Sequence, residues 1–497
     1  MRKFILRYWP LILLVLIALF IRLYRLPATL IFLEDEGRDL LIVKRMIDTL
    51  RPVLLGPQTS TGNMYLGPLY YYFITPAVYL ARMSPLGPAI LIAITGAATV
   101  GLLYFYGKRW FSSSAGWLAA TLYALMPLPV QFTRNSWNPN LVPLISLLIV
   151  ILVVNLSTHV SQNWKRDFLF LGAAVGFLVQ LHYMALIFLV GVAIVMILTW
   201  YKKWRQLILG IGLSLVTFVF TLSPFIIFEI RNDFVNTHAI TRFIEAKEEH
   251  NIRYKVPFAH WENKVTDTTT RLFSSLLGTE GSAPDPYRLP ITIAAVALIS
   301  LGLLTRSRTY FILFGLTVIP LLLVGIYQEN VHLHYLGFLF PLIYLLPAAV
   351  PRGRWLLIIC LLYAVPQTYR YVSWQGNNQL IRAQEVADYV VQKSAGRPYN
   401  LASIKDATIS PYLYYSHLSS NPPTTQSEST LFLICQDQLC SDPEINSPNL
   451  FLTGPSHPTL TAYLGHPLVN DDSRPRRIVS QEHVSHGAWV VEVQFDN

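Results

Sequence analysis

Charged residues are scarce in this chain: only 13% of its 497 residues are Asp, Glu, Lys or Arg, whereas 53% are hydrophobic. Such a balance excludes an ordinary soluble protein. The net charge of +10 would by itself allow a nucleic-acid partner. However, the basic residues stand in short runs between hydrophobic segments, which is the pattern of topology determinants in membrane proteins. We therefore expect a lipid bilayer around the chain and no nucleic acid.

Cysteine is also rare, with three residues in the whole sequence. Cys360 lies within a hydrophobic segment and is interpreted as a small core residue. Cys435 and Cys440 are close enough in sequence to pair if their domain faces an oxidising compartment, and the sequence leaves this disulfide open.

Two further features are missing from the sequence. Met1-Arg2-Lys3 and the apolar run after it mimic a signal peptide, but Arg22, Tyr24 and Arg25 follow in place of a small-residue cleavage site. We therefore predict an uncleaved membrane anchor. No repeat of about 20 to 50 residues is visible, and the two halves of the hydrophobic region show no clear resemblance. Transporters often have such symmetry, so its absence counts against transport.

Hydrophobic runs of about 17 to 25 residues are long enough to cross a bilayer. They recur from the N-terminus to about Tyr371 and give twelve candidate spans. The segment 64–81 differs from the others because it contains two prolines and five tyrosines. Tyrosine prefers the membrane–water interface, where its ring is buried and its hydroxyl is hydrated. We therefore predict that this segment lies along the membrane surface.

The distribution of basic residues supports that prediction. With segment 64–81 at the interface, fourteen Lys and Arg residues of the short loops fall on one side, against Arg134 alone on the other. If the segment crossed the bilayer, the last eleven of these fourteen would face outward, and the positive-inside rule would fail. We predict eleven transmembrane helices, at 9–26, 86–106, 115–131, 140–156, 168–181, 184–200, 206–228, 290–305, 309–326, 333–350 and 355–370.

This topology places almost all polar sequence on the outer side of the membrane. The cytoplasmic side holds the N-terminus and short basic turns. The outer side holds a first loop at 27–85, a second long loop at 229–289 and the C-terminal region. We expect an α-helical polytopic membrane domain at 1–370 and an extracytoplasmic domain at 371–497.

The C-terminal region changes character after about Tyr371, because long apolar runs stop there. Apolar residues recur at helical spacing in 379–391, and 410–417 is also helix-like. Short strand-like runs accompany them, at 400–404, 431–435, 449–452 and 489–495. We predict a small α/β domain of roughly 125 residues.

The densest group of charges is Glu34-Asp35-Glu36-Gly37-Arg38-Asp39, directly after the first span. Ionisable groups beside the hydrocarbon are candidates for function, although a solvated loop that fixes topology is the alternative. Apolar residues from Gly37 to Leu50 fall mostly on one helical face, which predicts a helix on the membrane surface. With segment 64–81 this gives two surface helices, with carboxylates at their root where a lipid-linked phosphate would lie.

Four motifs resemble one superfamily. They are Asp35-Glu36-Gly37-Arg38-Asp39, Gly67-Pro68-Leu69-Tyr70-Tyr71-Tyr72, Arg134 with Trp137-Asn138-Pro139-Asn140, and His334-Tyr335 leading into Phe340-Pro341. Together they look like the membrane-embedded C-type glycosyltransferases, in the branch of protein O-mannosyltransferases and aminoarabinose lipid A transferases (glycosyltransferase family 39-like). The resemblance covers essentially the whole hydrophobic region, and the C-terminal region matches only vaguely.

The resemblance implies an inverting glycosyltransferase of the plasma (inner) membrane. It would move a hexose or pentose from a polyprenyl-phosphate donor to an extracytoplasmic lipid, glycan or protein hydroxyl. Asp35 is implied as the base that activates the acceptor, which suffices for a single displacement. Glu36 and Asp39 are interpreted as supporting acids, and Glu34 as a solvated residue.

The leaving phosphate needs cations rather than an acid. The residues proposed to bind it are Arg38, Arg134, Arg231, His334 and Tyr335. The residues proposed for the substrate pocket are Tyr65, Tyr70, Tyr71, Trp137, Asn138, Asn140, His182 and Glu229.

Some of these residues have simpler explanations. Glu229 and Arg231 could form a local salt bridge at a helix end, and His182 could be a satisfied polar residue at a corner between spans. Trp137 and the tyrosines could belong to an ordinary aromatic belt.

Cofactors are not assigned from the sequence. Glu329, His332 and His334 have metal-ligating side chains, but their spacing on an exposed turn is weak evidence for a metal site. No metal is therefore predicted, and a requirement for a divalent metal stays open.

The chain also departs from the family. Asn63 and Gly67 stand where relatives often carry a basic residue, and Asn138 and Asn140 where they often carry an acid. Either phosphate contacts have moved or acceptor binding differs, while Asp35 is unaffected.

Two rival functions remain. The first is a lipid-linked sugar transporter or flippase without transferase activity, against which the nearly uncharged midspan regions count. The second is an inactive scaffold, against which the intact Asp35-Glu36 pair counts.

Overall fold

The computed structural model describes residues 2–59, 64–158, 162–245, 261–277, 288–327, 330–351, 353–403, 409–424, 428–436, 438–441, 451–452, 476–485 and 487–495. The chain divides into two compact units. We call the first, which comprises Met1–Tyr24, Leu54–Tyr70 and Ile90–Ser373, the helical unit. We call the second, which comprises Arg25–Val53, Tyr71–Ala89 and Trp374–Asn497, the mixed unit.

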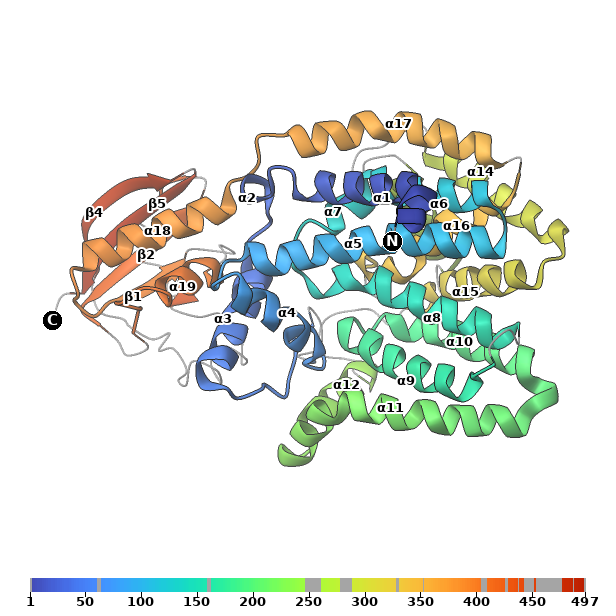
Figure 1. The fold of residues 1–497 in the computed structure, drawn as a ribbon. Helices are drawn as coiled ribbons and strands as arrows, with labels where there is room; N and C mark the ends of the chain where they lie inside the picture. The colour runs from blue at the N-terminus through green and yellow to red at the C-terminus, as the bar shows by residue number, and fades with distance from the viewer. Residues whose placement is uncertain are drawn as a thin grey trace. The chain divides into compact units, whose positions relative to one another are not determined.

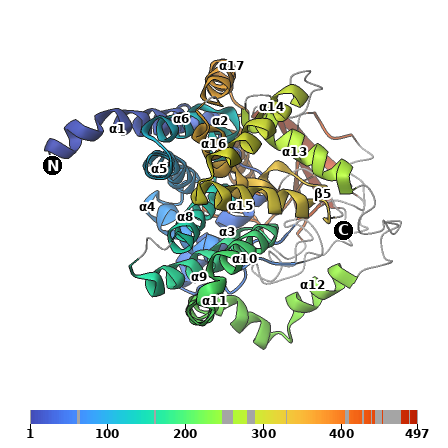
Figure 2. The same cartoon turned by 90° about the vertical axis from the view of Figure 1, so that its right-hand side faces the viewer.

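The helical unit consists of long apolar helices, and Figure 2 views many of them nearly end-on. One helix, or two consecutive helices, occupies most of each range that was predicted to cross the membrane. They are α1 (Arg2–Leu23), α5 (Leu86–Trp110), α6 (Ser113–Leu125), α7 (Pro127–Phe132), η1 (Asn138–Leu141), α8 (Val142–Ser157), α9 (Trp164–Leu181), α10 (Ala185–Trp200), η2 (Tyr201–Lys203), α11 (Trp204–Arg231), α14 (Arg288–Leu301), η3 (Gly302–Thr305), α15 (Arg308–Val324), η4 (Leu333–Leu339), α16 (Phe340–Ala349) and α17 (Gly353–Ser373). Two further helices, α12 (Val235–Glu245) and α13 (Trp261–Leu277), lie in the loop predicted at 229–289.

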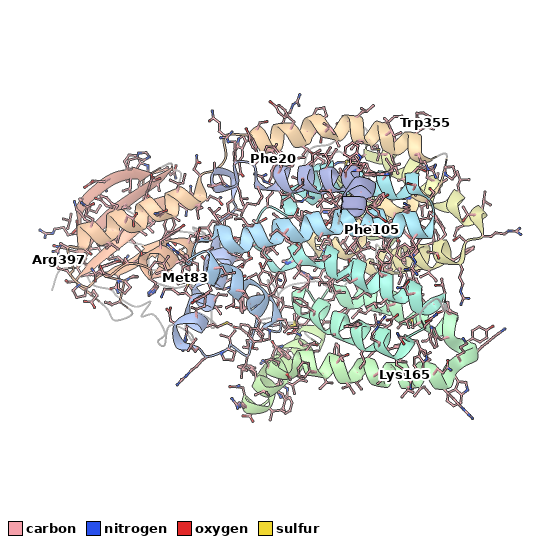
Figure 3. All side chains as sticks on the ribbon, in the orientation of Figure 1. Phe20, Met83, Phe105, Lys165, Trp355 and Arg397 are labelled. Atoms are coloured by element: carbon pink, nitrogen blue, oxygen red, sulfur yellow. A yellow bond between two sulfur atoms is a disulfide. The ribbon has the colours of Figure 1, made fainter. Side chains whose placement is uncertain are left out.

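Length and composition alone qualify four helical stretches of the described chain to cross a membrane. They are Leu86–Trp110, Asn138–Ser157, Ala185–Arg231 and Arg288–Thr305. Large apolar side chains on these and other helices face outward: Figure 3 labels Phe20, Phe105 and Trp355, which are 63%, 42% and 73% exposed. Such exposure suits a lipid environment, because bilayer tails solvate apolar side chains.

Two glycines let α9 and α11 pack closely side by side (Figure 1). A methyl group on Gly172 would lie 2.0 Å from the carbonyl oxygen of Ser214, and one on Gly176 would lie 2.0 Å from Thr221 Oγ1. The close approach allows Ser214 Oγ to donate to the Phe168 carbonyl at 2.7 Å. Helices in membranes associate through small residues and such hydrogen bonds, since apolar burial alone gains little there.

A buried arginine connects α1 to the break between α6 and α7. The Tyr123 carbonyl would normally accept a bond from the N–H of residue 127, which is a proline and has none. Arg22 replaces that donor: its guanidinium donates to the carbonyls of Tyr123 and Ala124, both at 3.1 Å, and to Thr133 Oγ1 at 2.7 Å. Arg22 is fully buried, so these partners compensate the cost of its charge.

The mixed unit combines a five-stranded sheet with helices (Figure 1). Its elements are α2 (Leu26–Thr29), α3 (Glu34–Thr49), most of α4 (Leu69–Leu80), α18 (Gln379–Ser394), β1 (Asn400–Ser403), α19 (Ser410–Ser416), β2 (Thr430–Gln436), β3 (Phe451–Leu452), β4 (Arg476–Ser485) and β5 (Ala488–Phe495). The strand order is β3-β1-β2-β5-β4, in which β1 and β2 are parallel and the other pairs antiparallel. The domain boundary at 370/371 stays a prediction. The last segment of the mixed unit starts at Trp374, and its first two segments, Arg25–Val53 and Tyr71–Ala89, lie mostly in the predicted first loop.

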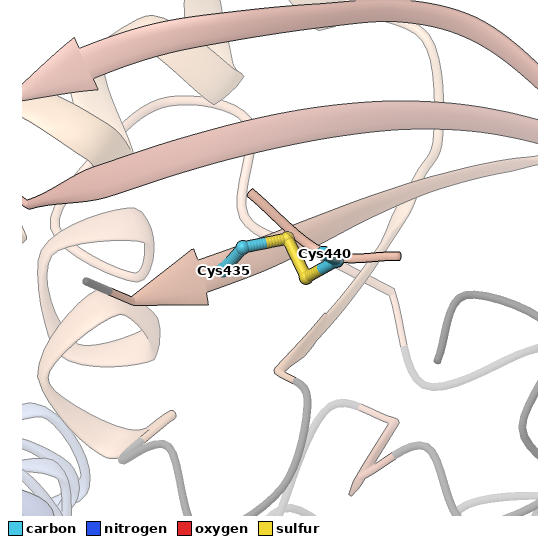
Figure 4. Close-up of a disulfide and its surroundings, with 2 residues drawn as sticks. All are labelled: Cys435 and Cys440. Atoms are coloured by element: carbon cyan, nitrogen blue, oxygen red, sulfur yellow. A yellow bond between two sulfur atoms is a disulfide. The ribbon is translucent and has the colours of Figure 1, made fainter. Parts of the chain in front are cut away.

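Strand β4 was not predicted from the sequence. It lies at the edge of the sheet and alternates between partly buried and exposed residues over most of its length. An edge strand with one solvated face needs few apolar residues, so its composition gives little signal. The neighbouring core contains a disulfide between Cys435 and Cys440, whose Cα atoms are 5.5 Å apart (Figure 4).

Both helices predicted in the first loop are present, as α3 and α4, but α3 is more buried than predicted. Helix α4 has 12 residues, about 18 Å in length, which is too short for a hydrocarbon core of about 30 Å. Its length supports a surface position. Helix α3 is less exposed than an amphipathic surface helix: all residues from Glu36 to Val43 are buried, and α3 packs against α19.

We predict that Gly172→Ala destabilises the helical unit, because the added methyl overlaps the α11 backbone. Overpacking of this kind costs about 1–3 kcal/mol. The thermal midpoint of the purified protein in detergent measures the effect. Gly212→Ala on α11 is the matched control, since no atom lies within 4 Å of its added methyl. Equal midpoints for the two variants would contradict the packing account.

Candidate functional site

The acidic sequence after the first span begins helix α3. Glu34, Asp35 and Glu36 occupy its first turn, where negative side chains are favoured by the helix dipole. Glu36 Oε2 accepts a hydrogen bond from the backbone N–H of Leu33 at 3.1 Å, which caps the helix start. Glu36 therefore supports the position of Asp35 from within the same turn.

Arg38 holds two of the carboxylates together. Its Nη1 donates to Asp35 Oδ1 at 2.7 Å, while Nε and Nη2 donate to Asp39 Oδ1 at 3.0 and 2.8 Å. The side chains of Arg38 and Asp39 are only 4% and 3% exposed, whereas that of Asp35 is 44% exposed. Asp35 is thus the carboxylate of this triad that an outside molecule can reach. We call Asp35, Arg38 and Asp39 the acidic triad.

Tyr71 completes the buried side of the acidic triad. Its hydroxyl donates to Asp39 Oδ1 at 3.0 Å, and the tyrosine itself is fully buried. The other oxygen of Asp39, Oδ2, is buried and accepts no hydrogen bond within the described part of the chain. Tyr71 was predicted as a pocket residue, and its contact in the structure is with the triad.

Burial and ion pairing shift the pKa values of Asp39 and Arg38 in opposite directions. Burial raises the pKa of Asp39 to about 6, although Arg38 and the Tyr71 hydroxyl favour the carboxylate. Burial also disfavours the charge of Arg38, but the carboxylates of Asp39 and Asp35 outweigh it and hold the pKa of Arg38 above its ordinary value. Arg38 is therefore a permanent cation beside Asp35.

The surroundings of the Glu34 side chain differ from the predicted ones. The sequence left it as a solvated residue, whereas its two oxygens accept hydrogen bonds from the Ser410 hydroxyl at 2.5 Å and the Ser410 N–H at 3.0 Å. Burial raises the pKa of Glu34, and the bonds from Ser410 lower it. Neither Ser410 nor this contact was visible in the sequence, because 376 positions separate the two residues.

In the helical unit, four predicted residues meet in one cluster. The ring of His334 lies 4.5 Å from that of Trp137 and 6.0 Å from that of His182, measured between centroids. The Tyr335 ring lies 4.5 Å from His182, and His332 stacks on His334 at 5.5 Å. We call Trp137, His182, His332, His334 and Tyr335 the histidine cluster.

His182 contributes a neutral aromatic ring to the histidine cluster, and not a cation. Burial lowers the pKa of His182 to about 4, so its ring is neutral at physiological pH and cannot pair with phosphate as a cation. Its Nδ1 accepts a hydrogen bond from the Met184 N–H at 3.2 Å. Among the described residues no group of three His, Cys, Asp or Glu side chains could hold a metal ion. Glu329 lies outside the described residues.

The predicted phosphate ligands Arg134 and Arg231 have different surroundings. Arg134 is 1% exposed; its guanidinium donates to the carbonyl of Tyr24 at 2.8 Å and to that of Ile21, at the end of α1. These bonds satisfy helix carbonyls that lack intrahelical donors. Arg231 is exposed at the last residue of α11. Their predicted phosphate contacts stay predictions.

Glu229 caps a helix instead of pairing with Arg231. Its carboxylate accepts bonds from the N–H groups of Asn236 and Thr237, at 3.1 and 2.7 Å, at the start of α12. Within the described chain, no ion pair joins Glu229 to Arg231. Asn236 Oδ1 in turn accepts from the Tyr65 N–H at 2.6 Å.

The remaining residues predicted for the substrate pocket bond to other residues of the helical unit. The Tyr70 hydroxyl lies 2.7 Å from Ser136 Oγ. Asn138 Nδ2 donates to the Leu181 carbonyl at 2.6 Å, and Asn140 Nδ2 to the Asn135 carbonyl at 3.0 Å. These residues fix the turn that carries Trp137, and their roles in substrate binding stay predictions.

Comparison with known proteins gives matches to a family model and to solved structures. Residues 66–228 match the family model described as dolichyl-phosphate-mannose-protein mannosyltransferase. The fold is similar to that of ArnT from Cupriavidus metallidurans in the apo state, with a TM-score of 0.60, 13% sequence identity and 97% of both chains covered. The same protein bound to undecaprenyl phosphate gives a TM-score of 0.55, 14% identity and 98% coverage of both chains. A sequence comparison with curated proteins gives no match.

At these identities the structural likeness shows the fold alone. Together with the family model, it confirms the resemblance to C-type membrane glycosyltransferases, in the branch that is similar to protein O-mannosyltransferases and ArnT. The chain is thus similar to this class of membrane proteins in sequence over residues 66–228 and in fold over nearly its whole length.

We predict that Asp39 makes stability depend on pH. Its pKa is about 6 in the folded chain and 3.8 ordinarily, so the folded state binds more protons between these values. The resulting stabilisation is complete below about pH 4 and is lost as the pH rises through about 6. Relative to Asp39→Asn, the wild type should gain about 1 kcal/mol in free energy of unfolding between pH 7 and pH 5. Parallel pH profiles of the two proteins would contradict this.

Proposed function

We propose that the protein is an inverting glycosyltransferase of the plasma membrane, with eleven transmembrane helices, a cytoplasmic N-terminus and an extracytoplasmic C-terminal α/β domain. Its donor is a hexose or pentose on a polyprenyl phosphate. Its acceptor is a hydroxyl of a lipid, glycan or protein on the outer side. The family model for dolichyl-phosphate-mannose transfer supports this donor class, as does a similar fold solved with undecaprenyl phosphate.

The acidic triad carries the proposal. A general base must be reachable by its substrate and held in place. Asp35 meets both conditions, because it is 44% exposed while its partner Arg38 is buried. Asp39 binds Arg38 from the interior, and the Tyr71 hydroxyl in turn binds Asp39. No other carboxylate of the triad is accessible, since Asp39 is 3% exposed.

The proposed reaction is a single displacement. Asp35 accepts the proton of the acceptor hydroxyl, whose oxygen forms a bond to the anomeric carbon. The bond from that carbon to the phosphate oxygen breaks, and its electron pair leaves with the polyprenyl phosphate. Because the new bond forms opposite the one that breaks, the anomeric configuration inverts.

The leaving phosphate gains negative charge and needs cations or hydrogen-bond donors. Among the predicted partners, Arg231 is exposed, whereas Arg134 and Arg38 are buried and already bonded. We therefore favour Arg231 as a phosphate ligand, followed by His334 and Tyr335 of the histidine cluster. The aromatic faces of that cluster also suit packing against a sugar ring.

Replacement of Asp35 by Asn should reduce sugar transfer at least about 100-fold, because Asn cannot accept the proton. The assay follows labelled mannose from undecaprenyl-phosphate mannose into acceptors of envelope extracts, with purified protein. Asp48→Asn is the matched control: it makes the same change on the same helix, at a carboxylate that pairs with Lys44 on the surface. Unimpaired transfer by Asp35→Asn would refute the assignment of the base.

The same preparation addresses the flippase alternative. In liposomes, a flippase moves the labelled lipid between leaflets while the bond between sugar and phosphate stays intact. Translocation without transfer to any acceptor would replace the proposed function by that alternative.

A further inference from the structure

The C-terminal region of the chain binds directly to the residues around Asp35. Glu34, its neighbour, accepts both donors of Ser410: Oε1 from the hydroxyl at 2.5 Å and Oε2 from the N–H at 3.0 Å. Ser410 is fully buried and begins α19, which lies beside α3 (Figure 1). A carboxylate that accepts two bonds from one residue is fixed in direction as well as in distance.

One helical turn later, the backbones touch. A methyl group at Gly37 would lie 2.5 Å from both Pro411 N and the Ser410 carbonyl carbon, so only glycine permits this approach. Glu34 and Gly37 are three positions apart and share one face of α3. Asp35 and Arg38 lie on the adjoining face. The contact therefore determines how the face with the acidic triad is turned.

The chain is also held before α3 begins. The N–H of Phe32 donates to Gln379 Oε1 at 2.9 Å. The Phe32 ring packs edge-on against Tyr414 and Tyr415 of α19, at centroid distances of 6.2 and 6.0 Å. The Tyr414 hydroxyl in turn donates to the carbonyl of Met83, which Figure 3 labels. C-terminal contacts thus precede and follow Asp35 within six residues of sequence, from Phe32 to Gly37.

Simple docking of one segment on another does not explain the contact at Glu34. Burial raises the pKa of Glu34, which shows that its charge is unfavourable there. An apolar pair of similar size would dock equally well or better, since buried polar pairs gain little net stability. What the bidentate bond adds is orientation, and orientation within a fraction of an ångström matters for a catalytic group.

We propose that Glu34 and Ser410 are positioning residues of the transferase, through which the C-terminal region fixes the orientation of Asp35. The inference rests on the proposed function. It gives the C-terminal domain a part in catalysis although none of its residues need touch the sugar.

The test compares full-length Ser410→Ala with Ser410→Thr, which retains the hydroxyl, and with Ser416→Ala. Ser416 is a matched control, because it is a fully buried serine of the same helix whose hydroxyl makes no bond to α3. We expect Ser410→Ala to lower kcat about ten-fold or more, with the KM for undecaprenyl-phosphate mannose changed less than about two-fold. Ser410→Thr should retain most of the activity, and Ser416→Ala nearly all.

A second readout separates this inference from the proposed function. Hydrogen–deuterium exchange should become faster in α3 of Ser410→Ala, and not in Ser416→Ala, whether or not a donor is known. Unchanged exchange in α3 would overturn the inference. So would faster exchange with an unchanged kcat. A wild type that transfers no sugar would instead refute the proposed function, and the positioning role with it. If Ser410→Ala does not fold, Glu34→Gln, which keeps the shape and one acceptor oxygen, gives the same readouts.

Discussion

A buried guanidinium between two carboxylates determines the start of α3. An unpaired charge in the interior costs several kcal/mol, so Arg38 requires partners wherever it lies. Asp39 satisfies it from the buried side and Asp35 from the accessible side, at 2.8 and 2.7 Å. Within the acidic triad the pairing leaves Asp35 at the surface, 44% exposed, and holds Asp39 beneath it, 3% exposed. The remaining contacts of the helix, from Tyr71, Glu36 and Ser410, support this arrangement.

The acidic cluster was predictable because charges beside a hydrophobic run are rare, and the family resemblance singled out Asp35 among them. Its partners were not. Ser410 lies 376 positions from Glu34, and no local pattern links the two. Arg134 was predicted as a phosphate ligand because it lies on the outer side and can pair with phosphate oxygens, and this role stays a prediction. The structure shows it bonded to carbonyls at the end of α1, whose need for donors composition does not reveal.

For secondary structure too, features that depend on local sequence were predictable, and features that depend on distant partners were not. Long apolar runs predicted the helices of the helical unit, because length and composition suffice there. The approach of α9 to α11 depends on Gly172 and Gly176, which stand out only once the partner helix is known. Strand β4 escaped because it is polar and lies at an edge. Helix α3 was expected on the membrane surface from its apolar face, whereas its residues from Glu36 to Val43 are buried and the helix packs against α19.

The proposed base, Asp35, is paired with the buried Arg38, and its neighbour Glu34 is bonded to Ser410 of the C-terminal region. The measurement that tests the central claim of the proposed function most directly is the anomeric configuration of the transferred sugar, determined by NMR on the product and compared with that of the polyprenyl-phosphate donor. A single base without a second nucleophile predicts inversion. Retention of configuration would contradict the account, because it requires a covalent glycosyl intermediate on a residue that the acidic triad does not supply.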